Sequence, residues 1–137
     1  MADTKQVDLT WQHRGLVFTG EGAGKVPITI DAANAEGPGP MESVLLALAA
    51  CTGSDLVVVL RKKRLDLREL RIEVRGERRE EHPQRYVAID LTYSVSAPGA
   101  TEEQVRHAID LSLAKYCSVT HSLNPAIAIR YELVLQA

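Results

Sequence analysis

The chain has 137 residues, 45% of them hydrophobic and 25% charged, with a formal net charge of −2 at pH 7. A chain of this length can bury a core without metal or disulfide staples, so we expect one domain over residues 1–137. The nearly balanced charge gives no electrostatic case for nucleic-acid binding. The N-terminus lacks a basic segment followed by an apolar core, so no secretory signal is visible and we expect a reducing, cytoplasmic location.

Three short strands are predicted in the first third of the chain, over residues 7–12, 16–19 and 25–30. Arg14-Gly15 and the glycine-rich segment 20–24 separate them with typical turn residues. The glycine-rich segment leads into a strand rather than into the N-terminus of a helix. We therefore interpret it as a hairpin turn and not as a phosphate-binding loop.

A long apolar helix follows. Gly39 and Pro40 suit a helix start, and the pattern predicts a helix from about Met41 to Lys63. This helix is apolar nearly all round, so most of its sides must be covered. The apolar stretch 44–60 contains Asp55 and small polar residues, and we expect it to fall short of a membrane span and to be a buried helix.

Clean alternation of apolar and polar residues predicts two further strands, at 70–75 and 87–95, joined by a charged hairpin tip at 77–83. Each of these strands has one apolar face and one polar face. The spacing therefore predicts a sheet that is covered on one side and exposed to solvent on the other.

The last third of the chain predicts one more helix and one more strand. Thr101 and Gln104 form a capping-box pattern, which opens a helix that we expect to continue to about Ser122. Asn124-Pro125 ends this helix, and residues 126–135 are predicted to be a strand. The resulting order of strands and helices is typical of an α+β protein.

Cys51 and Cys117 are the only two cysteines, and each lies in an apolar helical stretch with small neighbours. A thiol inside a helix is either a buried apolar group or a nucleophile tuned by its surroundings. Ser54 and Asp55 project near Cys51, at three and four residues further on. His121 lies one turn beyond Cys117, a spacing that suits a metal ligand pair or a nucleophile and base for acyl transfer. Zinc needs four ligands and the other histidines are scattered, so we expect no metal.

The segment GPGPMESVLLALAAC at 37–51, together with KYCSV at 115–119, resembles the OsmC/Ohr family of thiol peroxidases, and within it the YhfA-like branch. The resemblance covers nearly the whole chain, including the order of elements. It implies an OsmC-like fold in which antiparallel sheets surround a long central cysteine-bearing helix and a second helix. It also implies an intertwined homodimer with active sites at the subunit interface, in agreement with the apolarity of the first helix.

The resemblance further implies a reaction. In the family the first cysteine attacks a peroxide and becomes a sulfenic acid, which condenses with the second cysteine to a disulfide that dithiols reduce. Cys51 matches the first cysteine and Cys117 the second. The implied protein is a cytoplasmic enzyme, independent of cofactors, that reduces organic hydroperoxides and uses a dithiol reductant. The alternative is a non-catalytic dimeric module that binds an apolar ligand at the subunit interface.

Two further residues follow from the same resemblance. The family enzymes use an N-terminal arginine and a glutamate upstream of the first cysteine to hold the thiolate and orient the peroxide. Arg14 is the sole arginine before the first helix. The family glutamate lies ten residues before the cysteine, where this chain has Met41, whereas Glu42 lies nine before it. Glu42 therefore either takes the catalytic position or caps the N-terminus of the helix.

Overall fold

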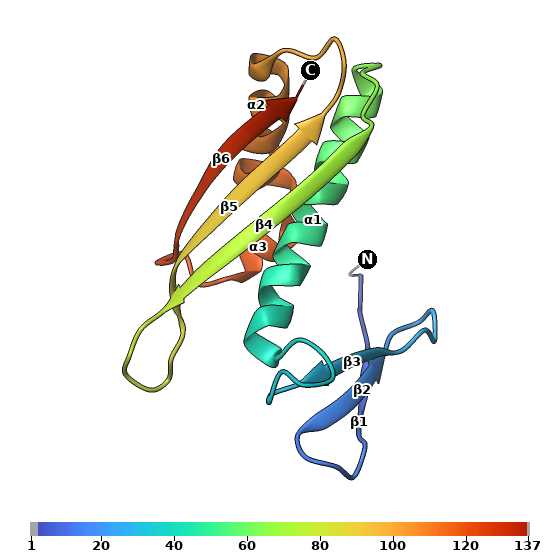
Figure 1. Cartoon of the computed structure of the whole chain (residues 1–137), viewed down its shortest axis with the longest axis vertical. Coiled ribbons are helices and arrows are strands. Elements are labelled where there is room, and N and C mark those ends of the chain that lie inside the picture. Colours follow the sequence, from blue (N-terminus) through green and yellow to red (C-terminus); the bar gives the residue numbers. More distant parts are fainter. Residues whose placement is uncertain (1–2, 137) are drawn as a thin grey trace. The chain divides into compact units, whose positions relative to one another are not determined.

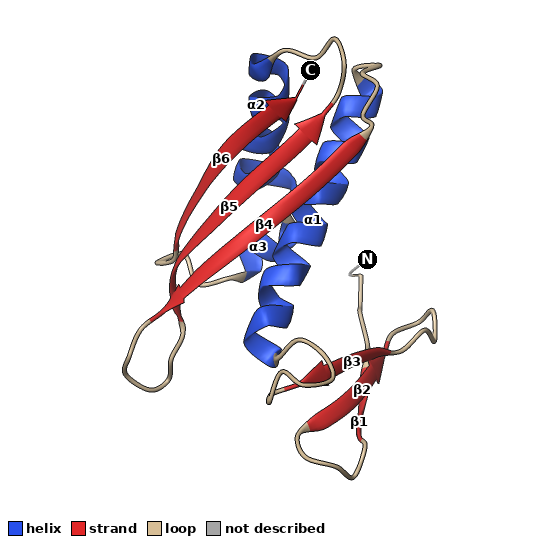
Figure 2. Ribbon diagram, in the orientation of Figure 1, coloured by secondary structure: helices blue, strands red, loops and turns tan. Residues whose placement is uncertain are grey.

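The computed structural model of the chain describes residues 3–136. The chain divides into two compact units, Met1–Val44 and Leu45–Ala137. Three strands form the first unit, and most of the helical residues belong to the second (Figure 1). Strands and helices are segregated along the chain, which confirms the α+β class (Figure 2). One domain over residues 1–137 stays a prediction.

The first unit is an antiparallel meander in the order β1-β2-β3. Its strands are β1 (Asp8–Trp11), β2 (Val17–Glu21) and β3 (Ile28–Asp31). The turn after β1 places Gly15 at φ 47°, a backbone conformation that favours glycine. The glycine-rich segment joins β2 to β3, as the hairpin interpretation predicted.

Asp31 organises the loop between β3 and the long helix. Its side chain is buried, and its carboxylate oxygens accept three backbone N–H groups, from Ala33 at 2.9 Å, Ala35 at 3.1 Å and Glu36 at 3.0 Å. These hydrogen bonds, first of all the one from Glu36, lower the pKa of Asp31 because they stabilise the ionised carboxylate. The Asp31 carboxylate thus holds the loop through hydrogen bonds from the backbone of the loop itself.

The second unit contains a sheet in the order β4-β5-β6, built from β4 (Glu69–Arg78), β5 (Tyr86–Ser96) and β6 (Ala128–Gln136). β4 pairs antiparallel with β5, as expected, but β6 pairs parallel with β5. The sheet is therefore mixed, whereas antiparallel sheets were expected. The helical segment between β5 and β6 supplies the long crossover that a parallel neighbour requires.

Helix α1 (Pro40–Lys62) and helix α2 (Glu102–Leu111) lie against the same face of this sheet (Figure 1). Ile89, Leu91, Tyr93 and Val95 of β5 are fully buried on this face. Gly53 allows a close approach of α1 to β4, because a Cβ added there would lie 3.1 Å from Cδ1 of Ile72. This packing accounts for the core of the second unit.

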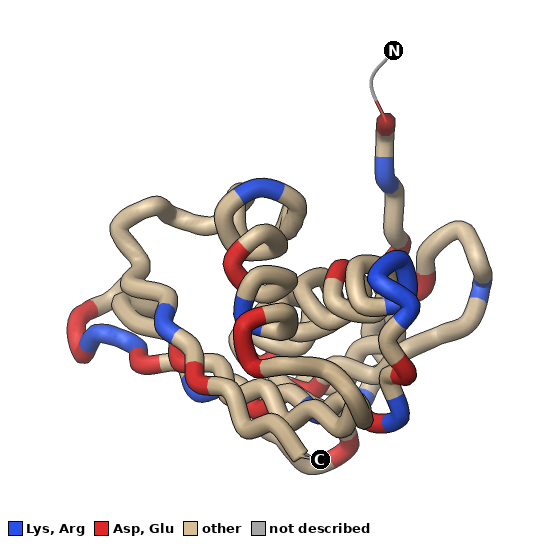
Figure 3. The backbone as a smooth tube through the Cα atoms, turned by 90° about the horizontal axis from the view of Figure 1, so that it is seen from above, with Lys and Arg blue, Asp and Glu red and all other residues tan. Residues whose placement is uncertain are grey.

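The opposite face of the sheet is polar, as the alternation predicted. Asp90 of β5 forms ion pairs with Arg130 of β6, at 2.9 Å, and with Arg75 of β4, at 4.0 Å. Basic and acidic segments are interspersed along the chain rather than gathered by sign (Figure 3). Residues of the two signs thus alternate along the backbone, in keeping with the nearly balanced net charge of −2.

The second predicted helix begins as expected and ends differently. The N–H of Gln104 donates to the Thr101 hydroxyl, and the Thr101 N–H donates to the Gln104 side chain, which confirms the capping box. The expectation of one helix to Ser122 is wrong. After α2 come a π-helical turn, η1 (Ser112–Tyr116), and a separate short helix, α3 (Ser118–Ser122). The break lies at Cys117, whose backbone is extended (φ −74°, ψ 99°).

Helix α1 has 23 residues and a mean hydropathy of 2.1 over its most apolar window, so by length and composition it could cross a membrane. This corrects the expectation that the stretch falls short of a span. A core helix of a soluble protein meets the same criteria, and Leu48, Leu56 and Leu60 of α1 are fully buried within the chain. Within the described residues only 28% of that window is buried, so one chain covers a part of this helix.

Candidate functional site

The structure brings the two cysteines together. Cys51 lies about three turns into α1 and is half-buried, whereas Cys117 lies between η1 and α3 and is fully buried. Both are free thiols, and they lie close enough for Cys51 to raise the pKa of Cys117. The two sulfurs are thus neighbours, with one partly accessible and the other inside the core.

The surroundings of Cys117 favour its neutral form. Burial raises the pKa of the Cys117 thiol, because a thiolate is poorly solvated in the core. The N–H of Thr120 lies 3.5 Å from Sγ and offsets part of this effect, whereas Cys51 raises the pKa further. The neighbouring Cys51 thiol therefore adds to the effect of burial and favours the protonated form of Cys117.

A chain of buried hydroxyl groups lies beside the thiols. The Tyr93 hydroxyl of β5 is 2.9 Å from Oγ1 of Thr52, the residue that follows Cys51 on α1. Oγ of Ser112 in η1 lies 3.0 Å from this Thr52 oxygen and 2.8 Å from Oδ2 of Asp55 on α1. Tyr93, Thr52 and Ser112 are all essentially buried. This series of hydrogen-bonded hydroxyl groups thus links β5, α1 and the π-helical turn.

A carboxylate oxygen accepts, so the Ser112 hydroxyl donates to Oδ2 of Asp55. The Ser112 hydroxyl is also bonded to Oγ1 of Thr52, and either hydroxyl can donate in the bond between Thr52 and Tyr93. The hydroxyl groups of Tyr93, Thr52 and Ser112 thus all have hydrogen-bond partners, as buried polar groups require. Burial raises the pKa of Tyr93 to about 12, so this phenol stays a donor at neutral pH.

Arg14 lies in the first unit and has a carboxylate partner there. Its guanidinium binds Glu36 in a bidentate pair, with Nε 2.9 Å from Oε2 and Nη2 2.6 Å from Oε1. The hydrogen bond from Arg14 lowers the pKa of Glu36, and the same bond raises the pKa of Arg14. Both side chains are exposed, so this pair contributes little to stability by itself. Arg14 is nevertheless held in a defined position.

Glu42 lies in the first turn of α1 and bonds to the chain just before it. Its Oε1 accepts the N–H of Gly39 at 2.9 Å and the side-chain amide of Asn34. An acidic side chain that accepts N–H groups at this end of a helix stabilises the helix start. The structure thus shows Glu42 in the capping arrangement, one of the two roles expected from the sequence.

Two neighbours of the cysteines that offered other chemistry, Ser54 and His121, are exposed to solvent. Ser54 is exposed, and its hydroxyl donates to the Ala50 carbonyl oxygen at 2.7 Å. His121 is exposed on α3, whereas the Cys117 thiol faces the core, an arrangement that gives no support to an acyl-transfer pair. Over residues 3–136, no three His, Cys, Asp or Glu side chains are grouped as a metal site would require.

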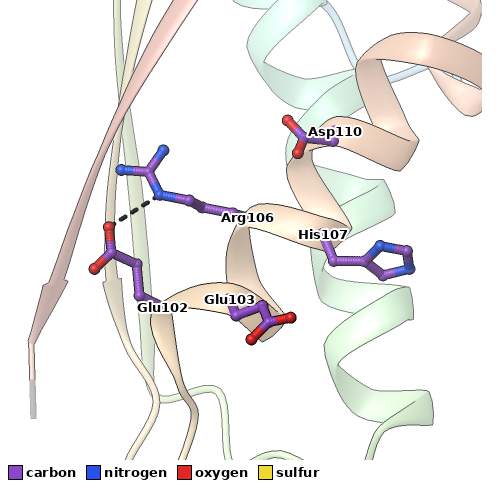
Figure 4. Close-up of a pocket in the computed structure, with 5 residues that line it drawn as sticks. All are labelled: Glu102, Glu103, Arg106, His107 and Asp110. Carbon is purple, nitrogen blue, oxygen red and sulfur yellow. Dashed lines mark hydrogen bonds and ion pairs between the residues drawn. The ribbon is translucent and has the colours of Figure 1, made fainter.

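Helix α2 borders a surface depression of a different character. Glu102, Glu103, Arg106, His107 and Asp110 line it, and all come from this one helix (Figure 4). Arg106 pairs with Glu102 at 2.9 Å, a typical pair one turn apart on a helix. The depression is open and its side chains are solvated, so we regard it as surface rather than as a reaction site.

These linked hydroxyl groups were not predicted from the sequence, although two of them belong to polar residues at positions where the pattern is apolar. Ser112 is a polar residue on the apolar side of the second helix, and Thr52 is a polar residue beside Cys51 in an apolar run. A polar side chain at a core position needs a partner, and this requirement could have indicated a buried link. The identity of the partners depends on how the second helix packs against α1.

The chain is similar in sequence and in fold to known proteins. Residues 33–132 match a family model described as "OsmC-like protein". The chain is 38% identical over 132 residues to the protein YhfA of Escherichia coli K12, an alignment that covers 94% of this chain and 98% of the relative.

Two solved structures show the same fold. An OsmC-like protein from Mycoplasma pneumoniae aligns with a TM-score of 0.86 and 21% identity, with all of both chains covered. The organic hydroperoxide resistance protein OhrB of Bacillus subtilis aligns with a TM-score of 0.61 and 18% identity over 98% of each chain.

Proposed function

This chain is a member of the OsmC-like protein family, as its cysteine segments predicted, and on that premise we propose that it is a thiol peroxidase that reduces organic hydroperoxides. One observation carries the proposal: the half-buried Cys51 thiol is a neighbour of the fully buried Cys117 thiol, close enough to raise its pKa. The fold that it shares with an organic hydroperoxide resistance protein supports the same reaction class.

Cys51 is the proposed attacking residue. It is the more accessible of the two thiols, since Cys117 is fully buried. The Cys51 thiolate attacks one peroxide oxygen, the O–O bond breaks, and the alcohol leaves with a proton from solvent. Cys51 becomes a sulfenic acid and the peroxide is reduced by two electrons.

Cys117 is the proposed resolving residue. Its sulfur attacks the sulfur of the Cys51 sulfenic acid, the S–S bond forms and the S–O bond breaks, and the thiol proton leaves with the hydroxide as water. Burial suits this role, because Cys117 needs to meet only Cys51 and never the substrate. A dithiol reductant then restores both thiols, and no cofactor takes part.

Arg14 and Glu42 belong to the proposal as groups that orient the peroxide, the roles that the family resemblance gives them. Each is bonded within the first unit, Arg14 to Glu36 and Glu42 to Gly39 and Asn34. Either role therefore requires the side chain to exchange its present partner for the substrate or the thiolate.

We also propose that the protein is a cytoplasmic homodimer that binds neither nucleic acid nor membrane. The packing of α1 against its own sheet supports a globular protein, and the interspersed charges supply no field that would attract a polyanion. A covering second copy accounts for the apolar residues that α1 leaves exposed.

The proposal is tested by single replacement of each thiol. Cys51→Ser is expected to abolish consumption of cumene hydroperoxide with a dithiol reductant, because the attacking sulfur is gone. Cys117→Ser is expected to react once and then to stall, with oxygen added at Cys51, because nothing captures the sulfenic acid. Mass spectrometry of the peroxide-treated wild type should find a Cys51–Cys117 disulfide.

Two outcomes would contradict these roles. One is full multiple turnover in both single variants, and the other is oxygen that accumulates first on Cys117. If the wild type keeps both free thiols after a stoichiometric dose of peroxide, the protein is instead a non-catalytic module.

A further inference from the structure

The π-helical turn links the two cysteines through one residue, Ser112. Its carbonyl oxygen accepts the backbone N–H of Cys117 at 2.7 Å, the bond that closes the turn. Its hydroxyl bonds to Thr52, the neighbour of Cys51, and to Asp55, one turn further along α1. The backbone of Cys117 and the helix that carries Cys51 are thus both fixed to the same residue.

The extra residue of a π-helical turn changes where the chain goes next. A π-helical turn closes its hydrogen bond over five residues rather than four, so the following residue leaves the α-helical path. Here that residue is Cys117, whose extended backbone sets its side chain at the start of α3 rather than on the surface of α2. The position of the Cys117 sulfur therefore depends on how this turn is held against α1.

We propose that Ser112 is a positioning residue that holds Cys117 against Cys51, and so sets how fast the sulfenic acid at Cys51 is captured. The inference rests on the proposed peroxidase function and adds a residue to it. Two reactions compete for the sulfenic acid: attack by Cys117, which gives the disulfide and water, and attack on a second hydroperoxide, which gives a sulfinic acid and an alcohol. Only the first depends on the distance between the two sulfurs.

The Ser112 hydroxyl is placed to control this competition. It is fully buried, and its two partners on α1 lie on either side of one helical turn. Ser112→Ala removes both bonds and leaves the carbonyl that closes the turn. The turn then keeps its backbone but loses its attachment to the helix of Cys51, so the disulfide forms more slowly while the attack of Cys51 on the first peroxide is unchanged.

The test measures how Cys51 partitions between disulfide and sulfinic acid. The reduced full chain is treated with ten equivalents of cumene hydroperoxide, quenched with a thiol-alkylating reagent and analysed by mass spectrometry. For Ser112→Ala we expect the ratio of sulfinic acid to disulfide to rise about fivefold over the wild type, which equals about 1 kcal/mol. The rate of the first peroxide reduction should stay at the wild-type value, a split that a general loss of structure would not give.

Ser122→Ala is the matched control, because it removes a serine hydroxyl of the same kind, one that is exposed and bonds to the Ser118 carbonyl oxygen within α3. It should give the wild-type ratio. If Ser112→Ala also gives the wild-type ratio, the positioning role is overturned. If the wild type forms no disulfide, the peroxidase proposal itself fails, a result distinct from the first.

A second variant covers the case in which Ser112→Ala does not fold, as judged by circular dichroism. Asp55→Ala removes one of the two partners of Ser112 at a half-buried position. A smaller rise in the same ratio would support the role of Ser112. An unchanged ratio in a folded Asp55→Ala protein would overturn it.

Discussion

At the scale of single residues, Tyr93 shows how the core combines a polar group with apolar packing. Its ring packs edge-on against Tyr131, with centroids 5.8 Å apart, and its hydroxyl reaches Thr52. Burial raises its pKa to about 12, and the ionisable groups around it are Cys117, Tyr131 and Asp55. The neutral phenol is therefore part of the folded structure, and its ionisation opposes folding.

This gives a prediction for stability at alkaline pH. Because the folded pKa of Tyr93 lies above its ordinary value of 10.0, its contribution is complete below about pH 10 and is lost as the pH rises toward 12. The free energy of unfolding should fall by about 2 to 3 kcal/mol over that range from this group alone. Denaturant titrations of Tyr93→Phe should show a shallower fall than the wild type.

Tyr116→Phe is the control for that measurement, since Tyr116 is 51% exposed. Its pH dependence should match that of the wild type. If the free energy of unfolding falls equally with pH in the wild type and in Tyr93→Phe, ionisation of Tyr93 does not destabilise the folded state.

The cysteines and the hydroxyl chain differ in how far the sequence reveals them. Cys51 and Cys117 are the chain's only thiols and lie in recognisable segments, so their pairing could be proposed from residues alone. Ser112 could not be assigned partners, because Thr52 and Asp55 lie on another helix and the residue pattern does not give the packing of two helices. The π-helical turn that begins at Ser112 and places Cys117 has no residue pattern of its own.

At the scale of elements, the start of α2 was predictable and its end was not. Thr101 and Gln104 satisfy each other's N–H groups through local hydrogen bonds, and local bonds of this kind are determined by nearby residues. The parallel pairing of β6 with β5 was also not predicted. It depends on a crossover through several helical segments, and the alternation of residues in a strand does not reveal the direction of its neighbour.

The capping box supports a second prediction. Thr101→Ala should reduce the free energy of unfolding by about 1 kcal/mol, because the Gln104 N–H loses its acceptor at the helix start. Thr101→Ser keeps the hydroxyl and should stay close to the wild type. Thermal unfolding at equal protein concentration measures both, and a Thr101→Ala protein as stable as the wild type would contradict the capping role.

At the scale of the whole molecule, the described residues leave many large apolar side chains exposed. On α1, Leu46, Ala50, Ser54 and Val58 follow one another at intervals of four residues and are all exposed. Such spacing forms a stripe along one side of a helix, and exposed apolar stripes are typical of protein interfaces. Further exposed apolar residues lie in the first unit: Val7, Leu9, Trp11, Leu16, Val26 and Ile28.

We therefore expect a stable homodimer with no folded monomer, in which a second copy covers this stripe. Its interface should be of the large, apolar class, with more than about 2,000 Å² buried in total. Leu46 and Val58 are 57% and 51% exposed, so Leu46→Glu with Val58→Glu should leave the chain's own core intact. The added charges would then be buried without partners in the dimer, a cost that should dissociate or unfold it.

Sedimentation equilibrium at micromolar concentration provides the measurement, with twice the chain mass of 15.0 kDa expected for the wild type. Gln136→Glu, at an exposed position near the end of β6, adds a charge away from the stripe and should remain dimeric. The paired glutamate variant should sediment as a monomer or lose its circular dichroism signal, because no single chain covers α1 on all sides. A wild-type protein that is folded and sediments at 15.0 kDa would overturn the expectation. The apolar stripe on α1 would then have to be tolerated in water.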